Sequence, residues 1–284
     1  MNEGEKMKEE IRYATLNDKM KIPTVGFGTW QIANEEAKDV VLSAIEVGYR
    51  NIDTAAVYGN EEGVGDAIKS MPIERKELFL STKVWNSDHG YDSTLRAMDE
   101  SLKKLKTDYV DLYLIHWPAP KNDKFVATWK ALNRLRTEGL ARSIGVSNFN
   151  VEHLERIIDE TGVVPSVNQI ELHPYFQQKQ LREFHDKHQI ITESWSPLAQ
   201  GKILDEPVLK KIAQEHNKSV SQIVLRWHYQ NGLVAIPKSL KTQRQFENFN
   251  LFDFSLTPKQ MEDILSLDRG AEGRVGPNPL TADF

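Results

Sequence analysis

Four polar side chains in this sequence stand where apolar runs give way to loops, and together they could transfer a proton: Asp53, Tyr58, Lys83 and His116. Asp53 ends a predicted strand that begins at Tyr49, and Tyr58 follows in the next loop. A carboxylate at a buried strand end needs a partner, because burying an unpaired charge is costly. We therefore expect Lys83, which ends the following strand, to lie beside Asp53. His116 closes the strand after that.

The chemistry that suits these residue types is the reduction of a carbonyl group. Hydride addition to a carbonyl carbon leaves negative charge on the oxygen, which needs a proton and hydrogen-bond donors. The pKa of an unperturbed tyrosine is near ~10. We expect the Lys83 ammonium to lower the pKa of Tyr58, while Asp53 holds the lysine charged. His116 would orient the carbonyl oxygen, and a redox cofactor must supply the hydride, because none of the four can do so.

A second group of side chains, at later predicted strand ends, could bind such a cofactor. Ser147, Asn148 and Gln169 could hydrogen-bond an amide, and Trp195 offers a flat face on which a nicotinamide could stack. Taken singly, these residues have structural interpretations: an isolated buried histidine or an Asp–Lys pair is more often structural, and Trp195 could belong to the core. Their convergence on strand ends favours a functional site.

The elements that must position these residues alternate between strands and helices. We predict strands over residues 25–29, 49–53, 78–83, 109–116, 141–147, 166–170, 190–195 and 233–236, most of them followed by an amphipathic helix. Strict alternation predicts a parallel sheet. An open doubly wound sheet is possible, but eight units in roughly 250 residues fit a closed (β/α)8 TIM barrel better, with its active site at the carboxyl ends of the strands.

The two ends of the chain differ from this pattern. Residues 13–16 and 22–25 flank the turn signal Asn17-Asp18, which predicts a short N-terminal β-hairpin. Thr257-Pro-Lys-Gln260 combines a helix cap, a first-turn proline and a capping-box partner, so a C-terminal helix begins there, and a loop follows from Arg269. We divide the chain into a polar leader, residues 1–12, and a single barrel domain, residues 13–284.

Composition excludes several other kinds of protein. The 284 residues include no cysteine, which rules out disulfides and thiolate chemistry and fits a reducing compartment. The net charge of −5 is mild and the sequence has no basic patch, so we expect no nucleic-acid partner. No apolar run reaches the ~18 residues of a membrane span, and the first residues are too polar for a signal peptide. We expect a cytoplasmic monomer.

Common cofactor and metal motifs are absent from the sequence. No Gly-x-Gly-x-x-Gly follows the first predicted strand, and there is no Walker loop, Gly-x-Ser-x-Gly elbow or His-Glu-x-x-His pair. His185 and His188 are three residues apart on a polar helix face, and we interpret them as solvated surface rather than as a metal-binding pair. We therefore expect no metal ion.

Six motifs, in this order, resemble those of the aldo-keto reductases: GYRNIDTAAVYGNEEGVG, LFLSTKVW, DLYLIHWP, GVSNF, VNQIELHP and IPKS. The resemblance runs from about Lys21 to Arg274. It implies a (β/α)8 barrel that uses NADPH. The family's catalytic tetrad matches four positions of this sequence: Asp53, Tyr58, Lys83 and His116. Tyr58 would then be the proton donor.

The resemblance also implies which residues contact NADPH. Ser147, Asn148 and Gln169 match the contacts to the carboxamide, and Trp195 matches the aromatic residue on which the nicotinamide stacks. Two cations near a predicted helix start, Lys238 and Arg244, match contacts to the 2′-phosphate. The remaining implied cofactor contacts are Ser196, Leu198, Ser239, Glu247 and Asn248.

Details of the sequence point to one bacterial branch of that family. Many members carry tyrosine where this chain has Trp195, but ESWSPLAQGK and the GRVGPNP tail resemble the branch typified by 2,5-diketo-D-gluconate reductase. The segment after His116 is short, which predicts an open, polar pocket lined by Trp30, Trp85 and Trp117, although Trp30 and Trp85 could equally be packing residues. We expect a small polar carbonyl substrate, such as methylglyoxal or a diketo sugar acid.

Two alternatives differ in function rather than in fold. Potassium-channel β-subunits resemble this fold and bind NADPH mainly as regulatory partners, so the chain could be a binding module. The enzyme could also act physiologically as an alcohol dehydrogenase, because the equilibrium and the cellular cofactor ratio decide the direction. Reduction of a carbonyl compound by the purified protein distinguishes the enzyme from the module.

Overall fold

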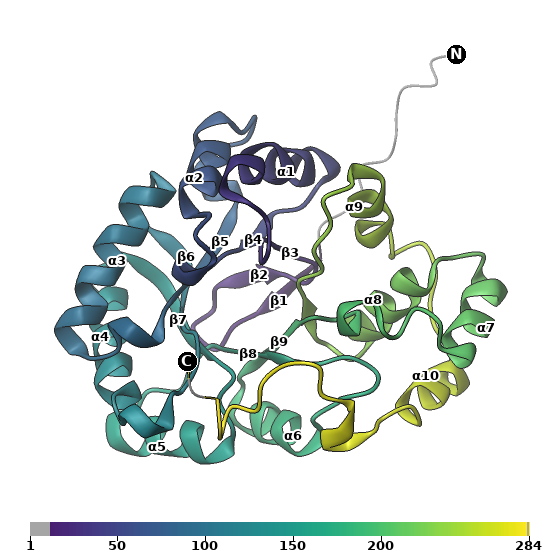
Figure 1. The fold of residues 1–284 in the computed structure, drawn as a ribbon. Coiled ribbons are helices and arrows are strands. Elements are labelled where there is room, and N and C mark those ends of the chain that lie inside the picture. Colours follow the sequence, from purple (N-terminus) through teal and green to yellow (C-terminus); the bar gives the residue numbers. More distant parts are fainter. Residues whose placement is uncertain (1–11, 283) are drawn as a thin grey trace.

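The computed structural model describes residues 12–282 and 284, and its main feature is a closed parallel barrel. Its strands are β3 (Phe27–Gly28), β4 (Asn51–Asp53), β5 (Phe79–Val84), β6 (Val110–Ile115), β7 (Ala141–Ser147), β8 (Val167–Glu171), β9 (Ile191–Trp195) and β10 (Val234–Ala235). Each pairs with the next strand in the chain, and a parallel bridge between Val25 and Ala235 joins the two ends of the sheet. This arrangement confirms the predicted (β/α)8 barrel and excludes the open sheet (Figure 1).

Helices surround the barrel (Figure 1). They are α1 (Asn34–Val47), α2 (Glu61–Ser70), α3 (Tyr91–Leu105), α4 (Phe125–Thr137), α5 (Val151–Thr161), α6 (Lys179–His188), α7 (Pro207–His216), α8 (Val220–Gln230), α9 (Thr242–Phe249) and α10 (Pro258–Leu265). Only the start of α9 was predicted from the sequence. The tail from Arg269 was predicted to be entirely loop, whereas Gly270–Gly273 forms a short 3-10 helix.

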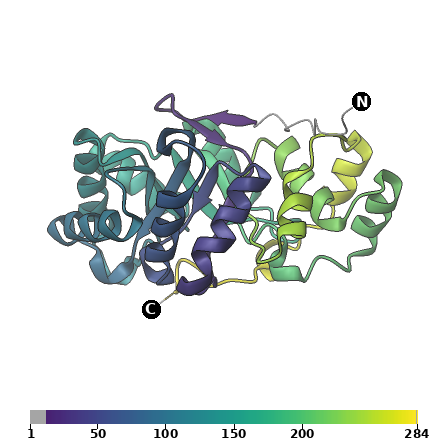
Figure 2. The same ribbon diagram turned by 90° about the horizontal axis from the view of Figure 1, so that it is seen from above.

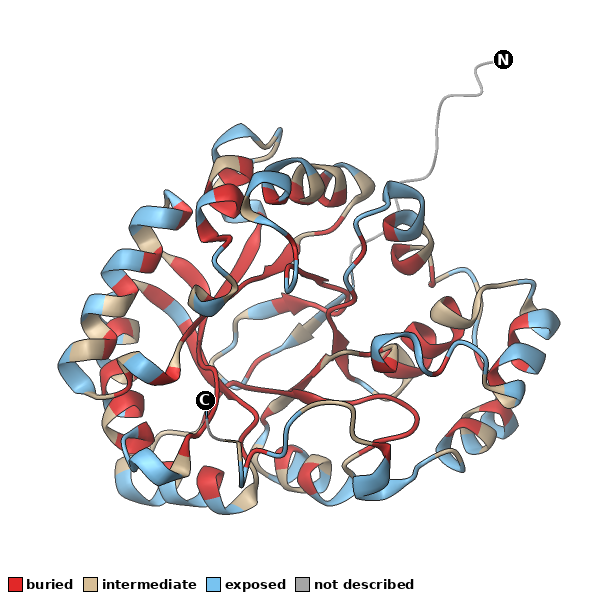
Figure 3. Ribbon diagram, viewed as in Figure 1, coloured by how far each residue is buried: buried red, intermediate tan, exposed pale blue. Residues whose placement is uncertain are grey.

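Alternating residues along the strands serve two separate cores. Phe79 and Leu112 point into the barrel, where they pack with Leu114 and Val234. Their neighbours in the strands, such as Leu80, face the helices and belong to the larger outer core. Figure 3 shows the strands buried and the outward faces of the helices exposed. At the carboxyl ends of the strands, some of the buried residues are polar, such as Asp53, Lys83 and Ser147. Side chains that could take part in a reaction are therefore concentrated at this end of the barrel.

The predicted N-terminal hairpin closes the opposite end of the barrel. Strands β1 (Tyr13–Thr15) and β2 (Lys21–Pro23) are antiparallel, and Ile22 is fully buried in the inner core. Asp18, in the turn, accepts a hydrogen bond from Ser143 at 2.7 Å. Figure 2 shows the hairpin and the C-terminus at opposite ends of the molecule. The predicted polar leader, apart from its last residue, lies outside the described residues.

His185 and His188 do not share a surface. His185 is fully buried, with its ring nitrogens 2.9 Å from Asn168 Nδ2 and 2.8 Å from Thr192 Oγ1. The prediction of solvated surface is therefore wrong for His185, because its ring turns inward and links α6 to two strands. Among residues 12–282 and 284, no group of three or more candidate side chains is placed to hold a metal ion, and no helix is long and apolar enough to span a membrane.

Candidate active site

A cavity of ≈1190 Å³ opens at the end of the barrel where the strands finish. It brings together all but one of the residues that the sequence predicts for the site. They are Trp30, Asp53, Tyr58, Trp85, His116, Trp117, Ser147, Asn148, Gln169, Trp195, Ser196, Leu198, Lys238, Ser239, Arg244, Glu247 and Asn248. The exception is Lys83, whose side chain has no exposed surface.

The loop that carries Tyr58 is held in place from both sides. Tyr58 ends a short 3-10 helix, and the next residue, Gly59, has φ of 69°, a left-handed conformation that favours glycine. Asn60 then donates to the backbone oxygens of Thr29 and Ile32 at 2.9 and 3.0 Å, and it accepts from Thr54 at 2.9 Å. These bonds tie the loop to the ends of β3 and β4, so the phenol has a fixed place at the cavity.

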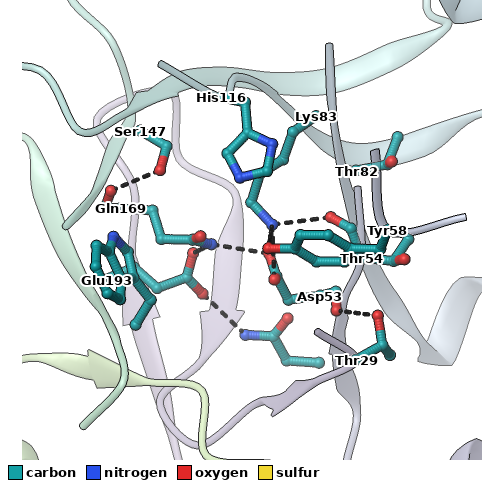
Figure 4. Close-up of polar contacts among 12 residues, drawn as sticks. Thr29, Asp53, Thr54, Tyr58, Thr82, Lys83, His116, Ser147, Gln169 and Glu193 are labelled. Carbon is teal, nitrogen blue, oxygen red and sulfur yellow. Dashed lines mark hydrogen bonds and ion pairs between the residues drawn. The ribbon is translucent and has the colours of Figure 1, made fainter. Parts of the chain in front are cut away.

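Lys83 is the centre of the polar cluster shown in Figure 4. Its Nζ lies 2.8 and 2.7 Å from the two carboxylate oxygens of Asp53 and donates to the backbone oxygen of Thr54 at 2.8 Å. The hydroxyl of Tyr58 lies 3.5 Å from the same nitrogen. The predicted Asp53–Lys83 pair is therefore present, and it places an ammonium group next to the phenol.

Burial and charge oppose each other in this cluster. Burial is the largest single effect on the pKa of Lys83 and lowers it, but Asp53, Tyr58 and Glu193 together raise it by more, so the net pKa is raised. For Tyr58, burial raises the pKa more than the Lys83 ammonium lowers it, and Asp53 adds to the rise. The predicted net decrease in the pKa of Tyr58 is therefore wrong, because burial outweighs the effect of the Lys83 ammonium and the Asp53 charge opposes it as well. A phenol with a raised pKa carries its proton at neutral pH.

His116 faces the phenol from the next strand end. Its ring centroid lies 5.6 Å from that of Tyr58 and 5.1 Å from that of Trp85, both edge to face. Burial, with a contribution from Lys83, lowers the pKa of His116 well below 6.5. The imidazole is therefore neutral at physiological pH and can donate one hydrogen bond without carrying charge.

The predicted amide-binding residues hydrogen-bond to one another. Asn148 Nδ2 donates to the backbone oxygen of His116 at 3.0 Å, and Asn148 Oδ1 accepts from the indole of Trp195 at 2.8 Å. Ser147 donates to the backbone oxygen of Gln169 at 2.8 Å. The amide nitrogen of Gln169 donates to Asp53 Oδ1 at 2.8 Å. These bonds join five strands, β4, β6, β7, β8 and β9, into one rigid rim.

Glu193 also belongs to this network, although it was not among the site residues predicted from the sequence. Its Oε2 accepts from Gln169 Nε2 at 2.8 Å, and its Oε1 lies 3.5 Å from Asn51 Nδ2 (Figure 4). The residue is fully buried in β9. An acid inside the apolar run IITESW is a signal in the sequence, because a buried carboxylate needs partners. Its partners could not be found from the sequence, since they lie on other strands.

The titration of Glu193 should destabilise the protein as the pH rises. Burial, followed by the charge of Asp53, raises the pKa of Glu193 from 4.5 to about 7. A carboxyl group with a raised folded-state pKa favours folding below its unfolded pKa, and this contribution is lost as the pH rises through the folded pKa. Relative to the Glu193→Gln variant, the wild type should lose about 2 kcal/mol of unfolding free energy between pH 5 and 8. Urea titrations across that range measure the difference, and a constant difference would contradict the prediction.

The far end of the cavity carries the two predicted phosphate-binding cations. Lys238 follows β10, and Arg244 lies in the first turn of α9. Neither forms an ion pair within the part of the chain that the structure describes. Gln245 fixes the segment, because its Nε2 donates to the backbone oxygen of Ser239 at 3.0 Å. The cavity therefore runs from an aromatic and amide-lined end to a cationic end.

Comparison with known proteins identifies the family. The sequence model of the Aldo/keto reductase family matches residues 24–269. The chain belongs to this family. It is 52% identical over 270 residues to an aldo-keto reductase of Mycolicibacterium smegmatis, covering 95% of this chain and 98% of the relative. It is 51% identical over 266 residues to methylglyoxal reductase DkgA of Escherichia coli K12, covering 93% and 95%.

A solved structure resembles this aldo/keto reductase along its whole length. The crystal structure of a Gox0644 mutant in complex with NADPH has a TM-score of 0.94 and 50% identity, covering 97% of this chain and 100% of that one. The protein is therefore an enzyme, an oxidoreductase that reduces carbonyl groups. This assignment excludes the alternative of a purely regulatory module.

The C-terminal tail adds a wall to the active site of this aldo/keto reductase. The backbone N–H groups of Val275 and Gly276 donate to the buried carboxylate of Glu171 at 2.6 and 2.9 Å. Further on, the ring of Phe284 stacks on Trp85, with centroids 5.6 Å apart and planes at 13°. It also meets Trp117 edge to face at 5.2 Å.

This end of the cavity is more aromatic than the sequence predicts. The expected pocket is open and polar, but Phe284 lies against two of the three predicted tryptophans, and Asn86 donates to its backbone oxygen at 3.2 Å. Trp30 remains 45% exposed at the rim. The difference arises because the tail turns back over the strand ends.

Proposed function

We propose that this aldo/keto reductase reduces small polar aldehydes and α-dicarbonyl compounds, such as methylglyoxal or a diketo sugar acid, to alcohols. The observation that carries the catalytic part is the position of Tyr58, which shares the cavity with His116 while Lys83 lies behind it. Tyr58 donates the proton to the carbonyl oxygen. His116 orients that oxygen as a neutral hydrogen-bond donor, and Asp53 fixes the Lys83 ammonium that stabilises charge on Tyr58.

The cofactor is NADPH, which supplies the hydride when bound. Its proposed contacts fit the chemistry of the cavity: Trp195 presents an aromatic face, Gln169 has an amide oxygen without a partner among the described residues, and the opposite end carries Lys238 and Arg244. Ser147, Asn148, Ser196, Leu198, Ser239, Glu247 and Asn248 complete the proposed set. The Gox0644 complex with NADPH supports this assignment.

Removing Arg244 should weaken the preference for NADPH over NADH. A hydrogen bond to a charged group contributes about 1.5–3 kcal/mol, so Arg244→Ala should reduce the difference in binding free energy between the two cofactors by that amount. Dissociation constants from fluorescence titration measure the effect. Arg96→Ala, which changes an exposed arginine outside the cavity, is the matched control and should leave the preference unchanged. Equal affinities of the wild type for NADPH and NADH would contradict the proposed phosphate site.

The proposed substrate class should show in a panel of carbonyl compounds. Methylglyoxal should be reduced with a kcat/KM roughly tenfold or more above that of any steroid ketone. A large ketone must displace Phe284 from Trp85 and Trp117, and each aromatic contact is worth about 0.5–1.5 kcal/mol. A small dicarbonyl displaces nothing, and its second oxygen can accept a hydrogen bond that strengthens as charge develops.

Propanal is the control for the second oxygen, because it has the size of methylglyoxal with only one carbonyl group. It should be reduced less efficiently than methylglyoxal. The relatives of this chain that are named methylglyoxal reductases support the proposal. A steroid ketone with the highest kcat/KM in the panel would contradict the proposed pocket but not the reductase assignment.

We also propose that the enzyme works as a monomer in the cytoplasm, without a nucleic-acid partner. The absence of cysteine fits a reducing compartment, and the net charge of −5 provides no excess of cations for phosphate backbones. Sedimentation velocity of the purified protein tests the oligomeric state, and a dimer at working concentration would contradict this part.

A further inference from the structure

The amide of Gln169 is held between two carboxylates. Its Nε2 donates to Asp53 Oδ1 and to Glu193 Oε2, each at 2.8 Å (Figure 4). An amide nitrogen has two hydrogens, and both are used here. The amide oxygen has no partner among the residues that the structure describes, and Gln169 lines the cavity. Gln169 therefore presents an acceptor, rather than a donor, to a ligand.

Glu193 supplies the second of the two acceptors. The oxygen and nitrogen ends of an amide have nearly the same shape, so only their hydrogen-bond partners fix which end points where. Asp53 alone would fix the orientation of the Gln169 amide only weakly, because both of its carboxylate oxygens already accept hydrogen bonds from Lys83. Glu193 pairs with Gln169 directly across β8 and β9, so its side chain emerges beside the amide.

We propose that Glu193 is a positioning residue, which fixes the Gln169 amide with its oxygen toward the cavity, where it accepts from the carboxamide NH2 of the nicotinamide. This inference rests on the proposed contact between Gln169 and the cofactor. Glu193 itself is fully buried and does not line the cavity, so it acts through Gln169 rather than on a ligand. Without this carboxylate, the Gln169 amide can turn and offer its nitrogen instead.

Two substitutions at position 193 separate positioning from packing. Glu193→Met keeps the length of the side chain but removes the acceptor, so residue 193 no longer fixes the orientation of the Gln169 amide. Glu193→Gln removes the charge and, like the protonated acid, offers Gln169 either an acceptor or a donor. The probes are NADP⁺ and its 3-acetylpyridine analogue, in which a methyl group replaces the carboxamide NH2 and no donor remains. Dissociation constants come from quenching of tryptophan fluorescence.

The expected result is a change in the ratio of the two dissociation constants. The wild type should bind NADP⁺ roughly 3- to 10-fold more tightly than the analogue, the range for one neutral hydrogen bond. Glu193→Met should reduce this ratio to about one, and Glu193→Gln should reduce it to the lower value that the wild type shows when Glu193 is protonated. A residue with only a packing role would weaken both ligands equally and leave the ratio unchanged. A wild-type ratio in Glu193→Met would overturn the proposal.

A third variant, Gln169→Leu, distinguishes failure of this inference from failure of the cofactor assignment. It should reduce the ratio to about one, and adding Glu193→Met should change nothing further. If Gln169→Leu keeps the wild-type ratio, the carboxamide contact itself is wrong, and the positioning role is overturned with it. If Gln169→Leu lowers the ratio but Glu193→Met keeps the wild-type ratio, the contact between Gln169 and the carboxamide is supported and the positioning role of Glu193 is overturned.

If Glu193→Met does not fold, the pH dependence of the ratio of the two dissociation constants tests the same inference. The pKa of Glu193 is raised to about 7, and a protonated Glu193 donates, so it favours the flipped Gln169. The charged or titratable groups around it are Asp53, Lys83 and Tyr58, and the first two form an ion pair. The wild-type ratio should therefore fall by roughly threefold or more from pH 8 to 6, while Glu193→Gln should show a constant ratio. The phosphates are the same in both ligands and cancel. A wild-type ratio independent of pH would overturn the proposal.

Discussion

Tyr58→Phe should lower kcat by roughly 100-fold or more while leaving the affinity for NADPH nearly unchanged. The substitution removes the hydroxyl that lies 3.5 Å from Lys83 Nζ and keeps the ring that packs against His116. Loss of a general acid typically costs 10²- to 10⁴-fold in rate. Steady-state reduction of methylglyoxal gives kcat, and quenching of protein fluorescence gives the dissociation constant of NADPH.

Tyr113→Phe is the matched control for this experiment. Tyr113 is fully buried, whereas Tyr58 is half-buried at the cavity; the Tyr113 hydroxyl has no partner among the described residues, and the residue lies in the outer core, away from the cavity. Its loss should leave kcat within about twofold, because no group of the site depends on it. Near-normal turnover of Tyr58→Phe would show that another group donates the proton.

Lys83→Met should destabilise the fold and abolish most of the turnover together. The variant leaves Asp53 buried and without its cation, and breaking a buried ion pair typically costs about 3–5 kcal/mol of unfolding free energy. It also removes the charge that opposes the rise in the pKa of Tyr58. Urea titration measures the stability, and kcat should fall by roughly 100-fold or more, as for the loss of the acid itself.

The double variant Asp53→Asn/Lys83→Met separates the two effects of the lysine. Removing both charges relieves the unpaired carboxylate, so the double variant should recover most of the stability lost in Lys83→Met. Turnover should remain low, since no cation stabilises the charge on Tyr58. Recovery of turnover along with stability would mean that Lys83 serves the fold alone.

The sequence is sufficient to predict the barrel and the rim where the site lies. Hydrophobic periodicity is a local property, so each strand and helix can be found from its own residues, and closure of the sheet follows from eight alternating units. Parallel strands end at the same edge, which places Asp53, Lys83 and His116 together without knowledge of any contact. The structure confirms these placements.

The balance of burial and charge is decided only by the tertiary structure. From the sequence, Lys83 next to Tyr58 predicts a lowered phenol pKa, whereas in the folded protein burial, with the charge of Asp53, raises it. From the sequence, His185 is predicted to lie on the surface of a polar helix, but in the structure its ring is buried inside the protein. The solvent exposure of a helix residue depends on how its helix is rotated about its own axis against the barrel, and the residue types alone do not determine that rotation.

Contacts between residues that are far apart in the sequence are the second feature of the site that only the tertiary structure determines. Gln169 is 116 residues from Asp53 and 24 from Glu193 in the sequence, but its amide bonds to both. Phe284 comes 198 residues after Asn86 and still forms a wall of the cavity beside it. Local periodicity carries no information about such pairs, because the closure of the barrel and the return of the tail bring them together.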